Sequence, residues 1–366
     1  MSALLHGGAG IAIVRAASAA LTLPIDRAAG ALVLPVPGGL WTWVDGRRLE
    51  RWRCEANGHW AVAASRSFDT PVHALASSAD GGFVFAAHGD TLSLLDDAAT
   101  LLRRYVGSDL TGRHRGRAGT IVAHAGRRSV VVSWPTLGEW WEISLDPAAP
   151  PIFDGLVHDY RMAEAIAAPG YLGVRRAPLG TPMPEPEFVD ARVPWLAGCV
   201  GDRIEAVNLD IRRRIGERTL PGAKPGASLL RRAPTGWTWW LPAEDALHVL
   251  DTTRWQTVAR HALPADADGT LQVRSLQELG GTLWMLAASA SGAGLWRQRD
   301  ASWQHVATPA GRPVAMRADA ARQQLLVALA EPTRLVVLDE DGALREKWEL
   351  PNVGAPLDAR WLIGCG

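Results

Sequence analysis

Short runs of apolar residues recur along this chain, separated by turns that contain glycine or aspartate. In the clearest unit, strands are expected at 313–319, 324–330, 334–339 and 344–350, and the third of them ends at an aspartate. Alternation of apolar and polar residues with a period of two predicts β-strands, and no segment has the length and period of an amphipathic helix. Each unit is therefore expected to form a sheet of four strands.

Seven copies of this unit fit the sequence. They begin near Ala31, Val72, Gly119, Ala163, Ser228, Leu271 and Pro313. Repeated units of four short strands are typical of a β-propeller, in which each unit forms one blade. The expected fold class is therefore all-β.

The two ends of the chain carry strands that belong to no complete unit. Residues 357–363 resemble a first strand, whereas 11–15 and 20–25 resemble later strands with no first strand before them. Pairing them would complete one more blade and remove exposed sheet edges. We therefore expect a single β-propeller domain over residues 1–366 with eight blades, the last closed by the N- and C-terminal strands. The alternative is a seven-bladed propeller with a loose N-terminal ribbon.

A proline-rich stretch interrupts the fourth unit at residues 178–195. Proline has no N–H to donate to a strand ladder, and its fixed φ suits turns and loops. This stretch is therefore expected to be an insertion in the fourth blade, forming a surface loop between strands. The tryptophans mostly recur with the units, and we expect them to fill the space between neighbouring sheets.

Composition and charge restrict the classes of partner. The 38 basic and 38 acidic residues give a formal net charge of zero, so bulk charge does not favour nucleic acid as a partner. The three cysteines lie far apart, which argues against a disulfide framework or a structural zinc site. No apolar stretch has the length of a membrane span. The N-terminus has no basic region before its apolar residues, so a cytoplasmic location is expected.

No motif in the sequence requires catalysis. We find no nucleophile elbow, P-loop, dinucleotide-binding fingerprint or H-E-x-x-H motif. We therefore assign no catalytic residues and no metal ligands, and the leaning is against an enzyme. The first hypothesis is a non-catalytic accessory or scaffold propeller, without a cofactor, that binds another protein.

Four arginines recur at a constant step of 43 residues: Arg231, Arg274, Arg317 and Arg360. Each lies in the expected first strand of its unit, and first strands line the central channel of a propeller. A common phase would bring the four guanidinium groups to one height, where they could hold a carboxylate or phosphate. In the alternative, the arginines point to the rim and pair with turn acids such as Asp319 and Asp358.

With its units laid out, the chain resembles the eight-bladed d1-haem propellers of the cytochrome cd1 nitrite reductase and NirF superfamily. Residues 72–81 with 91–101 are similar to a second blade of that family. Residues 117–124 with 138–147 are similar to a third blade. Residues 156–159 resemble an element that opens a blade and carries a pocket histidine.

This resemblance implies a second hypothesis, a d1-haem-type tetrapyrrole-binding or biosynthesis protein. It implies that His158 and His124 face the ligand and that first-strand arginines hold its carboxylates; Arg117, which opens the third-blade phrase, is counted with them. The family's iron-ligating histidine opens the first blade, but 27–34 contains no histidine, and no C-x-x-C-H motif for a c-type haem occurs. These departures argue against nitrite reduction. The family is periplasmic, yet no export signal is readable.

Overall fold

The protein was studied as a computed structural model. It describes residues 2–7, 11–15, 21–23, 33–44, 46–55, 59–153, 157–159, 164–165, 167–264, 271–289, 292–299, 302–308, 311–350 and 356–362. Only the backbone is described for 2–7, 11–15, 21–23, 44, 157–159, 164–165 and 356–362. The described helices are three 3-10 turns: η1 (Ala125–Arg127), η2 (Pro135–Leu137) and η3 (Pro225–Ala227). No helix in this part of the chain is long and apolar enough to cross a membrane.

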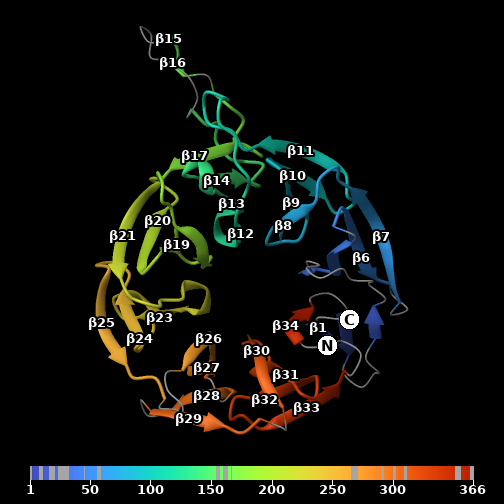
Figure 1. The fold of residues 1–366 in the computed structure, drawn as a ribbon, viewed down its shortest axis with the longest axis vertical. Coiled ribbons are helices and arrows are strands. Elements are labelled where there is room, and N and C mark those ends of the chain that lie inside the picture. Colours follow the sequence, from blue (N-terminus) through green and yellow to red (C-terminus); the bar gives the residue numbers. More distant parts are fainter. Residues whose placement is uncertain are drawn as a thin grey trace. The chain divides into compact units, whose positions relative to one another are not determined.

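Each blade is a sheet of four strands taken in the order of the chain (Figure 1). The first blade contains β4 (Val33–Val36), β5 (Gly39–Val44), β6 (Arg48–Cys54) and β7 (Trp60–Ser67). The second contains β8 (Val72–Ser77), β9 (Phe83–His88), β10 (Thr91–Asp96) and β11 (Leu101–Val106). The third contains β12 (Ile121–His124), β13 (Ser129–Trp134), β14 (Glu139–Ser144) and β17 (Val174–Pro178).

Four further blades follow the same order. The fourth contains β18 (Glu185–Val189), β19 (Trp195–Val200), β20 (Arg203–Asn208) and β21 (Arg213–Thr219). The fifth contains β22 (Leu229–Ala233), β23 (Gly236–Pro242), β24 (Leu247–Asp251) and β25 (Gln256–His261). The sixth contains β26 (Gln272–Leu279), β27 (Thr282–Ala288), β28 (Ala293–Arg299) and β29 (Ser302–Val306). The seventh contains β30 (Arg312–Asp319), β31 (Gln324–Ala330), β32 (Arg334–Asp339) and β33 (Leu344–Glu349).

One more four-stranded sheet combines the two ends of the chain. It contains β3 (Leu21–Leu23), β2 (Ile11–Arg15), β1 (Ser2–Gly7) and β34 (Pro356–Leu362), in that order. β34 pairs antiparallel with β1, so the expected pairing of the two ends is confirmed. The fold is thus an all-β propeller with seven blades of consecutive strands, the number given above as the alternative. The expected count of eight is corrected to these seven blades plus a composite sheet, because no repeat of consecutive strands builds that sheet.

The prediction of an insertion at 178–195 in the fourth blade was wrong. Residues 185–189 form β18, the first strand of that blade. The insertion lies instead in the third blade, where the two-stranded sheet of β15 (Val157–Asp159) and β16 (Glu164–Ala165) separates β14 from β17. Pro186 is compatible with β18 because this is an edge strand whose register shifts after Pro186, and both settings tolerate a residue without an N–H.

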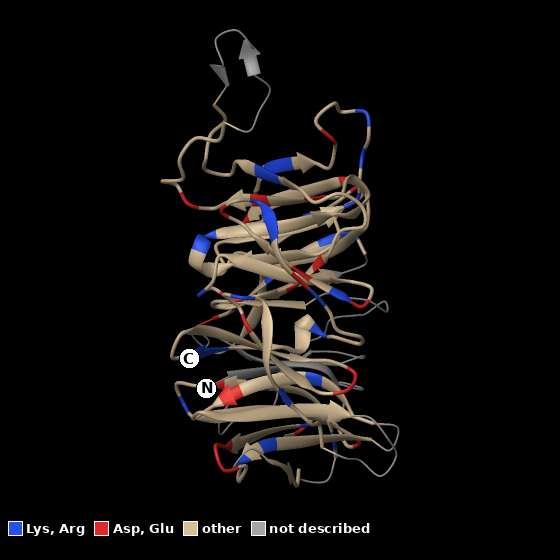
Figure 2. Ribbon diagram, turned by 90° about the vertical axis from the view of Figure 1, so that its left-hand side faces the viewer, with Lys and Arg blue, Asp and Glu red and all other residues tan. Residues whose placement is uncertain are grey.

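The chain divides into two compact units. Unit 1 comprises Met1–Leu40, Arg53–Ala61 and Leu220–Gly366, and unit 2 comprises Trp41–Trp52 and Val62–Thr219. The second, third and fourth blades belong to unit 2, whereas the fifth, sixth and seventh blades and the composite sheet belong to unit 1. Basic and acidic residues are both distributed over the strands and turns (Figure 2).

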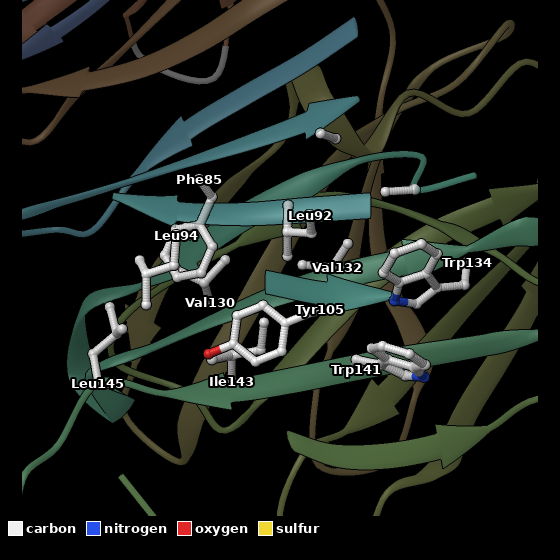
Figure 3. Close-up of a cluster of buried hydrophobic side chains, with 12 residues drawn as sticks. Phe85, Leu92, Leu94, Tyr105, Val130, Val132, Trp134, Trp141, Ile143 and Leu145 are labelled. Carbon is white, nitrogen blue, oxygen red and sulfur yellow. The ribbon is translucent and has the colours of Figure 1, made fainter. Parts of the chain in front are cut away.

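Aromatic and branched side chains fill the space between successive blades. In unit 2, Phe85 and Leu94 of the second blade belong to one buried cluster with Val132 and Trp134 of the third (Figure 3). The Trp134 ring lies against Trp141, with 4.6 Å between ring centroids. For these two residues, the prediction that tryptophans fill the space between sheets is confirmed. Within unit 1, buried clusters likewise join the fifth blade to the sixth and the sixth to the seventh.

Candidate functional site

A hollow of about 520 Å³ lies in unit 2 at the boundary of the second and third blades. This volume is typical of sites for small molecules or single side chains of a partner. Its walls come from the start of β8, the β9–β10 turn, the segment between β11 and β12, and η2. The lining residues are Thr70, Pro71, His73, Gly89, Asp90, Arg115, Gly116, Arg117 and Thr136.

Residues 107–116, which we call the 107–116 hairpin, form one wall. The Gly116 N–H donates to the Gly107 carbonyl oxygen at 2.8 Å, and the Asp109 N–H donates to the His114 carbonyl oxygen at 3.0 Å. At the tip, the Asp109 carboxylate accepts the Arg113 N–H at 3.0 Å. These bonds satisfy the backbone of a short excursion from the sheet, so the hairpin holds its residues in place before any ligand arrives.

The third blade anchors the base of this hairpin. Gly107 lies against the Trp134 ring, and Gly116 lies against the Thr136 hydroxyl. From β17, the Arg176 guanidinium donates to the Ser108 carbonyl oxygen at 2.9 Å. The sequence of this segment therefore places glycine where the chain approaches a neighbouring blade and basic residues between those glycines.

The hollow carries an excess of positive charge. Arg115 pairs with Asp90 at 2.9 Å, and this hydrogen bond is the main reason that the pKa of Asp90 lies below its usual value. Arg117 is exposed and forms no ion pair with any residue that the structure describes. Two guanidinium groups thus face one carboxylate.

His73 adds a polar but uncharged group. Its Nε2 lies 2.9 Å from the Ala118 carbonyl oxygen, and because a carbonyl only accepts, Nε2 carries the proton. Burial and the nearby Arg117 charge lower the pKa of His73 below its ordinary 6.5, although the bond to Ala118 acts in the opposite direction. Near neutral pH His73 is therefore uncharged, and Nδ1 is the ring nitrogen without a proton.

A second histidine lies behind the wall. The Nδ1 atom of His88 lies 3.1 Å from the hydroxyl oxygen of Thr70. Its Nε2 atom lies 2.8 Å from the hydroxyl oxygen of Ser93. Burial, Arg104 and His73 together lower the pKa of His88. Among the described side chains, no three of His, Cys, Asp and Glu have the arrangement of a metal site.

The structure separates the residues that the sequence grouped as one pocket. Arg117 lines the hollow, but His124 is buried at the end of β12, where its Nε2 donates to the Val193 carbonyl oxygen at 2.7 Å. His124 is therefore an interior histidine bonded to backbone. His158 lies in β15, for which only the backbone is described, so its predicted role falls outside the described side chains.

The structure places Arg231 and Arg317 at equivalent positions of their blades but places Arg274 elsewhere. Equivalent positions in the fifth, sixth and seventh blades can be identified from strand pairing. In each of these blades, a buried residue of the first strand pairs with the fourth residue of the second strand. These buried residues are Leu230, Leu276 and Met316. The positions that follow them hold Arg231, Gln277 and Arg317, which are 46 and then 40 residues apart. Arg274 lies three positions before this register, at a bulge in β26, because loops of different length separate the strands.

Arg231 is held by the neighbouring blade. Its Nη2 donates to Glu278 at 2.7 Å and to the Gly281 carbonyl oxygen at 3.2 Å, and its guanidinium lies over the Trp240 ring. Arg231 therefore pairs with an acid of the neighbouring blade and not with an acid of its own turn. For Arg360 the backbone alone is described, opposite Leu4. Ligand binding by Arg231, Arg274, Arg317 and Arg360 stays a prediction.

Sequence reasoning missed most of the hollow. His73 comes from β8, Asp90 from the β9–β10 turn, and Arg115 and Thr136 from the hairpin and η2, and only the fold brings them together. A signal was present in the run Gly112-Arg-His-Arg-Gly-Arg117, where alternating basic residues and glycines follow the last strand of a blade.

Comparison with known proteins agrees with the fold. No protein-family model and no curated protein matches the chain. The solved structure of dihydro-heme d1 dehydrogenase NirN in complex with DHE has a TM-score of 0.74 at 14% identity, over 100% of this chain and 76% of that chain. Sqt1 of Saccharomyces cerevisiae has a TM-score of 0.59 at 10% identity, over 86% and 83%. The C-terminal WD40 domain of Sif2 has a TM-score of 0.53 at 11% identity, over 90% and 86%. At these identities the likeness shows the β-propeller fold alone.

Proposed function

We propose that this β-propeller is a non-catalytic binding protein that accepts a carboxylate of its ligand or partner in the hollow beside the 107–116 hairpin. One observation carries the proposal: Arg117 is exposed in the hollow and pairs with no acid among the described residues. A guanidinium presents paired N–H donors in the geometry that a carboxylate requires.

The charge balance of the hollow favours one added anion. Arg115 and Arg117 contribute two positive charges, Asp90 contributes one negative charge, and His73 is uncharged near neutral pH. The hydroxyl groups of Thr70 and Thr136 are neutral. A single carboxylate would therefore complete the balance without leaving an uncompensated charge.

The expected affinity for a lone carboxylate is low. An exposed ion pair contributes about 0–1 kcal/mol, and a hydrogen bond to a charged group contributes about 1.5–3 kcal/mol. Together these correspond to a dissociation constant of about 1 mM or weaker. Tight binding therefore requires contacts outside the hollow.

Thermal unfolding in citrate, against sodium chloride of equal ionic strength, tests the proposal. Citrate well above its dissociation constant should stabilise the protein by roughly 1–3 kcal/mol, since it binds the folded state only. The substitution Arg117→Met keeps much of the apolar stem and should abolish this gain. Arg113→Met, on an exposed arginine of the same hairpin that does not line the hollow, should keep it. Equal stabilisation of wild type and Arg117→Met would overturn the proposal.

A second candidate ligand is a tetrapyrrole of the haem d1 type, whose carboxylates would suit the same guanidinium groups. The likeness to NirN, solved in complex with DHE, supports this candidate, and the predicted ligand-binding roles of His158 and the first-strand arginines belong to it. The hollow suits the carboxylates better than the iron. His73 leaves only Nδ1 for ligation, and this nitrogen is the more crowded one beside Cβ.

An absorption titration with a metal-free porphyrin that carries several carboxylates tests this candidate. The bound porphyrin should show a shifted main band, and Arg117→Met should weaken binding whereas Arg113→Met should not. If no band shift occurs at micromolar porphyrin, the candidate fails. The citrate experiment decides the first proposal separately.

A further inference from the structure

Residues 101–117, which we call the strip, combine positive charge with exposed apolar side chains. The strip contains five arginines and one acid, whereas the whole chain balances 38 basic against 38 acidic residues. Three apolar residues stand out in solvent: Leu102 is 43% exposed, Val106 is 42% exposed and Leu110 is 68% exposed. Arginine is enriched at protein interfaces, and exposed apolar side chains gathered on one segment are typical of an interaction site.

Among the described residues, the single acid of the strip forms no ion pair with these arginines, and Arg115 pairs with Asp90 outside the strip. The Asp109 carboxylate accepts the Arg113 N–H at 3.0 Å and the Thr111 hydroxyl at 3.0 Å. It is therefore used in closing the hairpin tip. The Arg103 guanidinium lies over the Tyr105 ring, which fixes its direction and leaves its charge unchanged.

The spacing of the exposed residues fits an extended partner. Arg104 and Val106 occupy alternate positions of β11 and therefore share one face of the strand, and the exposed Leu102 lies at the register shift between Leu101 and Arg103. β11 is the end strand of its sheet, in the order β11-β10-β9-β8. This row of exposed residues, with a basic side chain between two apolar ones along an edge strand, complements an extended chain with apolar and acidic side chains.

A chain of contacts connects this row to the hollow. Arg104 lies opposite Ser93 in the sheet, Ser93 contacts His88, and His88 contacts Thr70 in the wall of the hollow. The hairpin carries Leu110 at its tip and Arg115 at the hollow. One partner segment could therefore place a carboxylate in the hollow and further side chains on the row.

We propose that the partner is an acidic protein segment with interspersed apolar residues, which lies along the strip and places one carboxylate beside Arg117. This inference rests on the proposed function and names the partner class. The apolar residues favour a peptide over nucleic acid, because phosphate recognition gives Leu102, Val106 and Leu110 no partner. A single row of alternating residues favours it over a membrane surface, because a lipid interface requires a continuous apolar face.

Fluorescence polarisation with the full-length protein and a labelled peptide of alternating glutamate and leucine tests the inference. Peptides of alternating glutamate and serine, and of alternating glutamine and leucine, separate the charge from the apolar contribution. We expect both to bind at least about threefold more weakly than the glutamate-leucine peptide. Equal binding of all three peptides would overturn the inference.

Matched variants locate the surface. Arg104→Met and Leu110→Ser change exposed side chains of the strip, and each should weaken the peptide by about three- to fivefold. Arg299→Met and Leu344→Ser, on exposed residues of unit 1, should leave binding unchanged. The melting temperatures of all four variants, measured alongside, should stay at the wild-type value. Equal loss in the unit 1 controls would place the peptide elsewhere and overturn the inference.

Two competitors decide the class of partner. Single-stranded RNA and vesicles containing phosphatidylserine should bind more weakly than the glutamate-leucine peptide and should not be sensitive to Leu110→Ser. Tighter, Leu110-sensitive binding of either one overturns the inference. If citrate stabilises the protein through Arg117 but no peptide binds, the strip fails and the proposed function stands. If neither binds, both fail.

Discussion

Glycine is required at positions 107 and 116 because the third blade occupies the space of a side chain there. A Cβ on Gly107 would lie 2.0 Å from the Trp134 ring and 2.6 Å from the Gly116 carbonyl oxygen. A Cβ on Gly116 would lie 2.4 Å from the Thr136 hydroxyl oxygen. The place of Arg115 and Arg117 in the hollow therefore depends on two residues that carry no chemistry of their own.

Gly107→Ala should destabilise the protein by about 1–3 kcal/mol, because the rigid indole ring and the backbone of Gly116 must both move. The same shift should reduce the stabilisation by citrate. Gly82→Ala is the control, since its Cβ would meet only Asp80, at an ordinary 3.5 Å. Urea unfolding with and without citrate measures both effects. A Gly107→Ala protein as stable as Gly82→Ala would show that the hairpin base is not tightly packed.

The two histidines beside the hollow should make stability depend on pH. The folded-state pKa values of His73 and His88 lie below the ordinary 6.5, chiefly because of burial. Between the folded and unfolded pKa values the unfolded chain binds more protons, so stability falls as the pH drops below about 6.5. His73→Gln retains an N–H donor for the Ala118 carbonyl and removes the titration, so the loss between about pH 7.5 and about pH 5.5 should shrink.

Urea unfolding at the two pH values gives this difference, with His114→Gln on the exposed hairpin as the control. An unchanged pH dependence in His73→Gln would mean that the ring is accessible to protons in the folded state.

For single residues, the sequence predicted Arg117 as a ligand-binding residue but did not predict the other residues that line the hollow. The basic residues between Gly112 and Arg117 stand next to one another in the chain. The role of His73 depends on the carbonyl of Ala118, which is 45 residues away and belongs to a different turn. No local pattern encodes such a contact, so residue-level chemistry was predictable only where neighbours in sequence are also neighbours in space.

Among the elements, the turn after the third strand of a blade has a defined chemical reason for its aspartate. Asp96 Oδ1 accepts the N–H groups of Ala98 and Thr100 at 2.9 and 2.8 Å. In the fourth blade the position holds Asn208, whose side-chain oxygen accepts the Asp210 N–H at 2.8 Å. The strand therefore ends at a residue whose side chain satisfies the turn backbone.

Asp96→Ala should cost about 1–2 kcal/mol, because two backbone N–H groups lose their acceptor. Asp96→Asn should cost much less, since the amide oxygen serves the same role that Asn208 serves in the fourth blade. Urea unfolding of the two variants compares them directly. Equal destabilisation by alanine and asparagine would assign the effect to the charge of Asp96 and contradict this account.

The strands and turns could be predicted from the sequence because their patterns are local. The position of the insertion could not be predicted in this way. Five prolines made residues 178–195 look like a loop, yet Pro186 fits β18 because edge strands with a bulge tolerate proline. Pro313 behaves alike in β30, where the register shifts directly after it. In this protein, proline marks first strands of blades as well as loops.

For the molecule as a whole, the leftover strands at the two ends predicted their pairing because an open sheet edge is unfavourable. The composite sheet confirms that reasoning, and in it β34 pairs with β1 (Ser2–Gly7), a strand that neither leftover segment at 11–15 nor that at 20–25 contained. The segment is short and has no repeat partner in sequence. Arg274 departs from the register that Arg231 and Arg317 share, because loop lengths vary between blades and a constant spacing in the chain is not a constant position in the sheet.

Removal of residues 356–366 should therefore destabilise the protein far more than removal of a surface strand. β34 pairs with β1 along its length and contacts β4, β30 and β31 within unit 1. Its loss exposes the ladder groups of β1 and uncovers the seventh blade, which should cost about 3 kcal/mol or more. In a chain of this size that corresponds to a drop in melting temperature of about 4 °C or more. Removal of 363–366 alone, which keeps β34, should change it by no more than about 1 °C. If both truncated proteins have the melting temperature of the full-length protein, the composite sheet contributes nothing to stability. The pairing of the two ends would then not belong to the cooperative core of the fold.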